Sequence, residues 1–268
     1  MQLKIAALQM ISTRSVTENL NKASRMIAEA ASNGAQVIVL PEFFAKITTS
    51  EDLHRTDHAE ILENGTIQSS LKDLAVLHGI YIIAGSILLS SSITNKFYNS
   101  CLVISPEGLT LAHYDKIHLF KFNDGSQDYD ESEILLAGDQ VVRCDILGFK
   151  LGLAICYDLR FPELFRALGI VDVIVLPSAF TYQTGVAHWE LLIRARAVEN
   201  QCYFLGVNQG GMHETGRRTF GHSMLADPWG EVLVSALEGE KIIYAIINSD
   251  KIREVRSKLP ALEHRRIS

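Results

Sequence analysis

The sequence has few cysteines and few prolines. Its 268 residues include 4 cysteines and 6 prolines, and no two cysteines form a CxxC pair. Scattered single cysteines exclude the dense disulfide framework of a small secreted domain and are typical of a protein kept in a reducing compartment. We therefore expect a cytoplasmic protein whose cysteines remain free thiols.

The sequence also lacks the features that mark membrane, nucleic-acid and metal partners. No segment approaches the roughly 20 apolar residues that cross a bilayer, and the N-terminus has no charged region followed by an apolar core. The net charge is -6, whereas nucleic acids and anionic membranes attract clustered lysine and arginine. The histidines form no HExxH motif. We expect no membrane, no nucleic acid and no metal.

What remains is the composition of a globular domain. Hydrophobic residues make up 47% of the chain and charged residues 21%, which is sufficient for a sizeable core. No low-complexity or linker-like segment divides the chain. We expect one domain over residues 1–268, with a core at about 3–248 and a C-terminal helix and tail at 249–268.

Short apolar runs alternate with helical segments along the chain. The runs at 36–41, 81–88 and 150–155 are short enough to be buried strands. A helix is expected over about 185–200, where Val186, Trp189, Ile193 and Ala197 form an apolar stripe. Strands with interspersed helices and no internal repeat predict a layered α/β architecture.

Cys156 stands where a nucleophile is expected. It follows the apolar run 151–155, and Pro162 can then open a helix. A strand, a turn and a helix in this order lift a nucleophile out of a sheet and leave backbone N–H groups free to bind an oxyanion. The alternative is a structural role, because free cysteine is among the most buried residue types.

Two other strand ends carry groups that would help such a thiol. Glu42 follows the run that ends at Pro41, and Lys116 follows a strand expected at 109–114. A free thiol has a pKa of about 8.5, so it needs a base, which a glutamate can supply. A buried lysine and the N–H of Tyr157 can stabilise an oxyanion. The alternative for each residue considered alone is an exposed surface position at a strand end, because glutamate and lysine are mostly exposed.

Three motifs around these residues resemble one family. The strings PEF from Pro41, DKIHLF from Asp115 and LAICYDLRFPE from Leu153 resemble the nitrilase superfamily of carbon-nitrogen hydrolases in order and spacing. The resemblance continues in AHWELL from Ala187 and GHSM from Gly221, and so covers nearly the whole chain. It implies a four-layer α-β-β-α sandwich, no cofactor, and a homodimer or higher homo-oligomer.

The resemblance also implies roles for individual residues. Glu42 would be the general base, Lys116 the oxyanion stabiliser, and Cys156 the nucleophile that forms a thioester. Glu131 lies in the polar stretch 122–137, for which we expect an irregular loop. It falls where related amidases have a second glutamate that positions the substrate and the lysine.

The string CYDLRFPE resembles the amidase branch of the superfamily. Amidases that act on deaminated glutathione resemble the chain most, followed by ω-amidases that act on α-ketoglutaramate. Both substrates end in an α-keto acid, so Arg160 would bind its carboxylate, with Phe180 as an apolar wall. Alternatively, Arg160 forms an ion pair with Asp158 or Glu163.

Two other functions are compatible with the motifs. An N-carbamoyl amino-acid hydrolase would share Glu42, Lys116 and Cys156, and only substrate-loop residues such as those at 181–187 would distinguish it. A catalytically idle scaffold would keep the fold, but the presence of all four candidate catalytic residues argues against it. We therefore expect an amidase with a small-molecule amide as its substrate.

Overall fold

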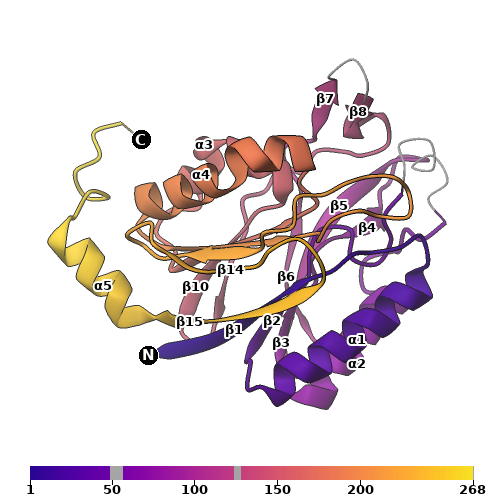
Figure 1. Cartoon of the computed structure of the whole chain (residues 1–268), viewed down its shortest axis with the longest axis horizontal. Coiled ribbons are helices and arrows are strands. Elements are labelled where there is room, and N and C mark those ends of the chain that lie inside the picture. Colours follow the sequence, from indigo (N-terminus) through magenta and orange to yellow (C-terminus); the bar gives the residue numbers. More distant parts are fainter. Residues whose placement is uncertain (49–56, 124–127, 268) are drawn as a thin grey trace.

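Two β-sheets lie face to face between two layers of helices (Figure 1). The computed structural model describes residues 1–48, 57–123 and 128–267. The first sheet has the strand order β15 (Lys241–Asn248), β1 (Gln2–Gln9), β2 (Val37–Val39), β3 (Tyr81–Ile83), β5 (Phe97–Ile104) and β4 (Ile87–Ser90), with β6 (Thr110–Asp115) also paired to β5. The second has the order β14 (Val232–Ser235), β13 (Met224–Ala226), β12 (Tyr203–Asn208), β11 (Val173–Ser178), β10 (Phe149–Leu153) and β9 (Arg143–Ile146).

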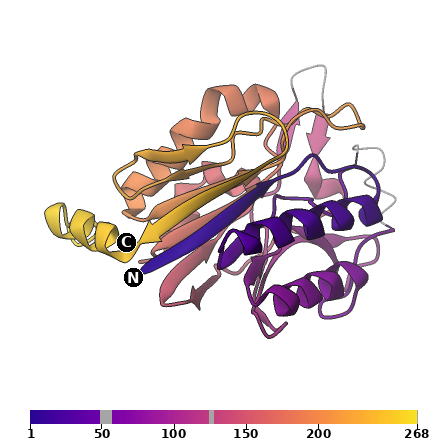
Figure 2. The ribbon, with the colours of Figure 1, turned by 60° about the horizontal axis from the view of Figure 1, so that its bottom comes forward.

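Helices cover the outer face of each sheet. Helices α1 (Val16–Ser32) and α2 (Thr66–His78) lie side by side on the first sheet, as Figure 2 shows, and α3 (Pro162–Ala167) and α4 (Tyr182–Asn200) lie on the second. Helix α5 (Ser249–Lys258) follows β15 at one end of the sandwich. None of the described helices is long and apolar enough to cross a membrane. The predicted four-layer α-β-β-α sandwich is confirmed.

The core explains why the central strands are continuously apolar. In β1, the side chains of Leu3, Ile5 and Ala7 belong to a hydrophobic cluster that also contains residues of the second sheet. Those of Ala6 and Leu8 belong to another cluster, which contains residues of α1 and α2. Successive side chains of a strand point to opposite faces, so a strand covered on both sides has no polar face. Packing on both faces holds these strands in place. It therefore also holds the residues that follow the strand ends, which include the candidate site residues.

The predicted strand at 81–88 is wrong in one respect, because it is two strands. Strands β3 and β4 are separated at Gly85, whose φ is 34°. A Cβ at this position would lie 2.1 Å from the carbonyl oxygen of Pro41, so only glycine permits the close approach. The break thus lets the chain pass directly beside the segment that carries Glu42.

Two other expectations need correction. Val186 is not part of the buried stripe of α4, since it is 62% exposed while Trp189, Ile193 and Ala197 are fully buried. The stretch 122–137 is more regular than the expected loop. It contains part of β7 (Lys121–Asn123), the strand β8 (Asp128–Asp130) that pairs with it, and a 3₁₀ turn, η2 (Glu131–Glu133). Residues 124–127 of that stretch lie outside the described residues.

Candidate active site

The structure brings Glu42, Lys116 and Cys156 together between the two sheets. Glu42 and Lys116 follow β2 and β6 of the first sheet, and Cys156 follows β10 of the second. Glu42 is 1% exposed, Lys116 0% and Cys156 8%. The alternative that Glu42 and Lys116 are exposed residues at strand ends is therefore wrong.

Three donors hold the Glu42 carboxylate. Its Oε1 accepts hydrogen bonds from Lys116 Nζ and from Asn99 Nδ2, each at 2.9 Å. Its Oε2 accepts one from the backbone N–H of Ala179 at 2.7 Å. Burial raises the pKa of Glu42, but Lys116 more than offsets this, and the pKa lies below its ordinary value. Glu42 is therefore a carboxylate at neutral pH.

The Lys116 ammonium lies between two carboxylates. Its Nζ is 2.8 Å from Glu131 Oε2 and 2.9 Å from Glu42 Oε1. Burial lowers the pKa of Lys116, but Glu131 and Glu42 outweigh it, so the pKa lies above its ordinary value. Burial raises the pKa of Glu131, which also accepts a hydrogen bond from Phe120 N at 2.8 Å. Lys116 is thus a permanently charged, immobilised donor.

Cys156 occupies a strained turn. Its φ of 47° is in the left-handed region, which non-glycine residues seldom adopt and which is common at functional sites. It begins a 3₁₀ turn, η3 (Cys156–Arg160), and Pro162 then opens α3. Burial raises the pKa of Cys156 well above its ordinary value, and the negative charge of Glu42 raises it further. The resting residue is a thiol beside a carboxylate.

Asp158 connects the segments that carry Lys116 and Cys156. It is fully buried, and its Oδ2 accepts hydrogen bonds from Tyr114 OH at 2.7 Å and Ile155 N at 2.8 Å. Its Oδ1 accepts one from His118 N at 3.0 Å. Tyr114 and His118 lie on either side of Lys116 in the sequence, and Ile155 precedes Cys156. Asp158 therefore fixes the position of the ammonium relative to the thiol.

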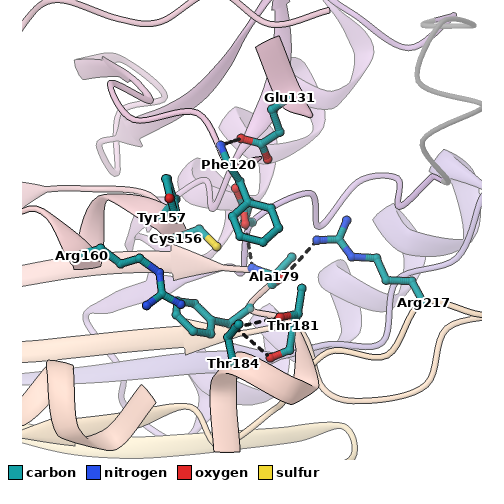
Figure 3. A pocket seen from close by; sticks show the side chains of 11 residues that line it. Phe120, Glu131, Cys156, Tyr157, Arg160, Ala179, Thr181, Thr184 and Arg217 are labelled. Carbon is teal, nitrogen blue, oxygen red and sulfur yellow. Dashed lines mark hydrogen bonds between the residues drawn. The ribbon is translucent and has the colours of Figure 1, made fainter. Parts of the chain in front are cut away.

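A pocket opens onto the thiol, with about 280 Å³ of empty space that includes its mouth on the solvent side. Its lining includes six of the predicted site residues: Glu42, Glu131, Cys156, Tyr157, Arg160 and Phe180. Figure 3 shows the Cys156 sulfur facing the pocket, with Arg160 and Arg217 on opposite sides of it. In the part of the chain that the structure describes, no cluster of three His, Cys, Asp or Glu side chains could hold a metal ion.

Arg160 lies against aromatic rings at the pocket wall. Its guanidinium carbon is 5.3 Å from the ring centre of Phe180 and 5.8 Å from that of Tyr157. Its Nη1 is 3.2 Å from His188 Nδ1. Among the described residues it forms no ion pair with Asp158 or Glu163, so the alternative that Arg160 is a structural ion-pair partner is wrong.

Sequence reasoning did not find four residues of this region. Asn99 and Ala179 hold Glu42, His188 contacts Arg160, and Arg217 lines the pocket and donates to Ala179 O at 3.0 Å. Asn99 carried a usable signal, because a polar residue inside a strongly apolar strand needs a partner. Ala179 acts through its backbone, for which its side chain gives no signal.

Comparison with known proteins gives the family. The model of the carbon-nitrogen hydrolase family matches residues 4–257. The chain belongs to the carbon-nitrogen hydrolase family. It is 40% identical to a deaminated glutathione amidase of Synechocystis, over 97% of each chain, and 38% identical to omega-amidase NIT2 of mouse, over 99% of this chain and 95% of that one. The predicted resemblance is confirmed.

The fold agrees with solved members of the same superfamily. The crystal structure of Saccharomyces cerevisiae Nit3, a member of the nitrilase superfamily, superposes with a TM-score of 0.88. The two chains are 31% identical, and the match covers 99% of this chain and 97% of Nit3. This carbon-nitrogen hydrolase is therefore an enzyme that acts on amide C–N bonds, as the sequence predicted.

Proposed function

We propose that this hydrolase cleaves a linear carboxamide through a thioester on Cys156, with Glu42 as general base and Lys116 as oxyanion stabiliser. The observation that carries the proposal is the buried cluster itself. A thiol, a buried carboxylate and a fixed ammonium meet below one small pocket. A thiol with a raised pKa needs a base during attack, and Glu42 is within its reach.

The first half of the reaction forms the thioester. Glu42 takes the proton of Cys156 as the sulfur forms a bond to the amide carbon. Lys116 and the N–H of Tyr157 stabilise the negative charge on the carbonyl oxygen. The C–N bond then breaks, Glu42 returns the proton to the nitrogen, and an amine or ammonia leaves.

The second half releases the acid. Glu42 takes a proton from a water molecule as the water oxygen bonds to the thioester carbon. The C–S bond breaks, a carboxylic acid is released, and the proton returns to the sulfur. Glu131 keeps Lys116 in place throughout, because its carboxylate contacts the ammonium through both oxygens at 2.8 and 3.0 Å.

The proposed substrate is deaminated glutathione. Amidases of this name from three organisms are 34–40% identical to the chain. The α-keto acid end of deaminated glutathione carries a carboxylate. Arg160 would bind that carboxylate, since a planar guanidinium binds carboxylates through two parallel hydrogen bonds. Phe180, over which Arg160 lies, would contact the apolar part of the acyl chain.

α-Ketoglutaramate is the second candidate substrate. It is favoured by the 38% identity to omega-amidase NIT2 of mouse, and it has the same α-keto acid end without the peptide-like leaving group. The two candidates therefore differ only on the leaving-group side of the scissile bond. An N-carbamoyl amino acid remains the third candidate substrate.

One parallel assay tests all of these. The purified protein is offered deaminated glutathione, α-ketoglutaramate and an N-carbamoyl amino acid, and kcat/KM is measured for each. The proposal expects the highest value with deaminated glutathione and no turnover by Cys156→Ala. A higher value with one of the other two substrates would replace the proposed substrate, and no turnover of any amide would favour the idle scaffold.

We also propose that residues 1–268 form one domain that assembles at least as a homodimer in the cytoplasm. Helix α4 exposes apolar side chains to solvent, with Val186 62%, Leu191 67% and Val198 48% exposed. A second copy would cover them in an isologous contact. Sedimentation of a 29.8 kDa monomer at micromolar concentration would argue against the dimer. Leu191→Glu should shift the dimer toward monomer. Microscopy of a fluorescent fusion tests the proposed cytoplasmic location.

A further inference from the structure

His188 contacts Arg160 through a ring nitrogen. The distance from His188 Nδ1 to Arg160 Nη1 is 3.2 Å. A guanidinium has five N–H donors and no acceptor, so Nδ1 must accept this hydrogen bond with its lone pair.

An imidazole nitrogen that accepts this hydrogen bond orients Arg160 without forming an ion pair with it. A carboxylate at this place would also hold the guanidinium, but it would neutralise the charge and compete with an anionic substrate. Among the described residues no carboxylate pairs with Arg160, and Asp158 is occupied by Tyr114, Ile155 and His118. The pocket wall thus carries a cation with which none of the described carboxylates forms an ion pair.

The contacts of Arg160 restrict its side chain in two ways. The rings of Phe180 and Tyr157 lie against it at 5.3 and 5.8 Å and limit where the guanidinium can move. The bond to His188 fixes one N–H and therefore the rotation of the guanidinium plane. A free arginine side chain has roughly 2 kcal/mol of rotamer entropy, part of which is lost on binding unless the side chain is ordered beforehand.

We propose that His188 is a positioning residue that aims Arg160 at a substrate carboxylate and so determines the preference for acidic amides over uncharged ones. The inference rests on the proposed role of Arg160 in substrate binding. It assigns His188 no contact with the reacting atoms. Its loss should therefore raise KM for carboxylated substrates rather than lower kcat.

The test compares a linear monoamide that carries a terminal carboxylate with an uncharged amide of the same chain length. The measured quantity is the ratio of their kcat/KM values. His188→Leu should lower this ratio about tenfold, mainly through KM of the acidic amide, because an oriented charge-assisted hydrogen bond is lost. His188→Gln, which keeps an accepting oxygen, should restore most of the ratio. His188→Glu should lower it at least as much as leucine.

Controls separate the possible failures. Glu190→Gln lies on the same helix but is exposed and pairs with Arg194, so it should leave the ratio as in the parent. Thermal melting shows that each variant folds. An equal loss on both amides in His188→Leu, or a His188→Gln variant no better than leucine, overturns the inference. Arg160→Met tests the carboxylate site itself. If this variant leaves the ratio of the two kcat/KM values as in the parent, Arg160 does not bind the substrate carboxylate.

Discussion

The hydrogen bond from Asn99 to Glu42 can be removed almost alone. Asn99 is fully buried on β5, and its Nδ2 donates to Glu42 Oε1 at 2.9 Å. Within the described residues its Oδ1 has no hydrogen-bond partner, so Asn99→Leu removes one donor and no other side-chain interaction. Its backbone carbonyl, which accepts from Lys116 N, stays in place. The substitution therefore tests the environment of Glu42 with little disturbance of Lys116.

The expected effect is a rise in the pKa of Glu42. The lost bond stabilises the charged carboxylate, and a hydrogen bond to a charged group contributes about 1.5–3 kcal/mol. Removing this stabilisation of the charged form therefore raises the pKa of Glu42. Glu42 starts below its ordinary value of 4.5, so the carboxylate remains the main form at neutral pH.

The assay is the pH dependence of kcat/KM, whose acid side reports groups of the free enzyme. As pH falls, Glu42 and Glu131 take up protons in coupled steps, because both carboxylates contact Lys116. The acid side of the profile should move upward in Asn99→Leu, while kcat/KM at pH 7 changes less than tenfold. Ser100→Ala, whose hydroxyl donates to Asp115 instead, is the matched control. An unmoved acid side in a folded Asn99→Leu variant would refute this account of Glu42.

The remaining predictions concern the residues around the thiol. Lys116→Met and Lys116→Arg should each lower kcat about 100- to 1,000-fold with substrate binding retained, because neither places a point charge at the oxyanion; turnover within a fewfold of the parent would make Lys116 purely structural. Asp158→Asn should lower kcat more than it raises KM, because it weakens the hydrogen bonds that hold the segments of Lys116 and Cys156 together. A change confined to KM would contradict this. Cys101 and Cys202, fully buried, should react with a thiol reagent more slowly than Cys156, as peptide mapping can measure.

The sequence predicted most of the fold because its signals were local. Continuous apolar runs indicated strands covered on both faces, and Pro162 correctly indicated the start of a helix after Cys156. The break at Gly85 could not be predicted, because it depends on the carbonyl of Pro41 from a distant segment. Val186 has the same helical spacing as Trp189 and Ile193 but is exposed. The sequence does not show where the second sheet stops covering α4.

The candidate site was predictable only where residue type carried information. Glu42, Lys116 and Cys156 stood at strand ends within family-like motifs, and the structure brings them together at one pocket. The bonds from Asn99 and from the backbone of Ala179 depend on tertiary geometry. The choice for Arg160 between a carboxylate site and an ion pair likewise depended on what surrounds Asp158, which the sequence does not show.

The central claim is that Cys156 carries the acyl group during turnover. The most direct measurement is the mass of the intact protein, and then of its peptides, after rapid acid quenching of a reaction with a saturating amide. The account predicts a mass increase equal to the acyl group, on the peptide that contains Cys156, and its absence in Cys156→Ala. An acyl group on another residue, or hydrolysis by a folded Cys156→Ala variant, would contradict it.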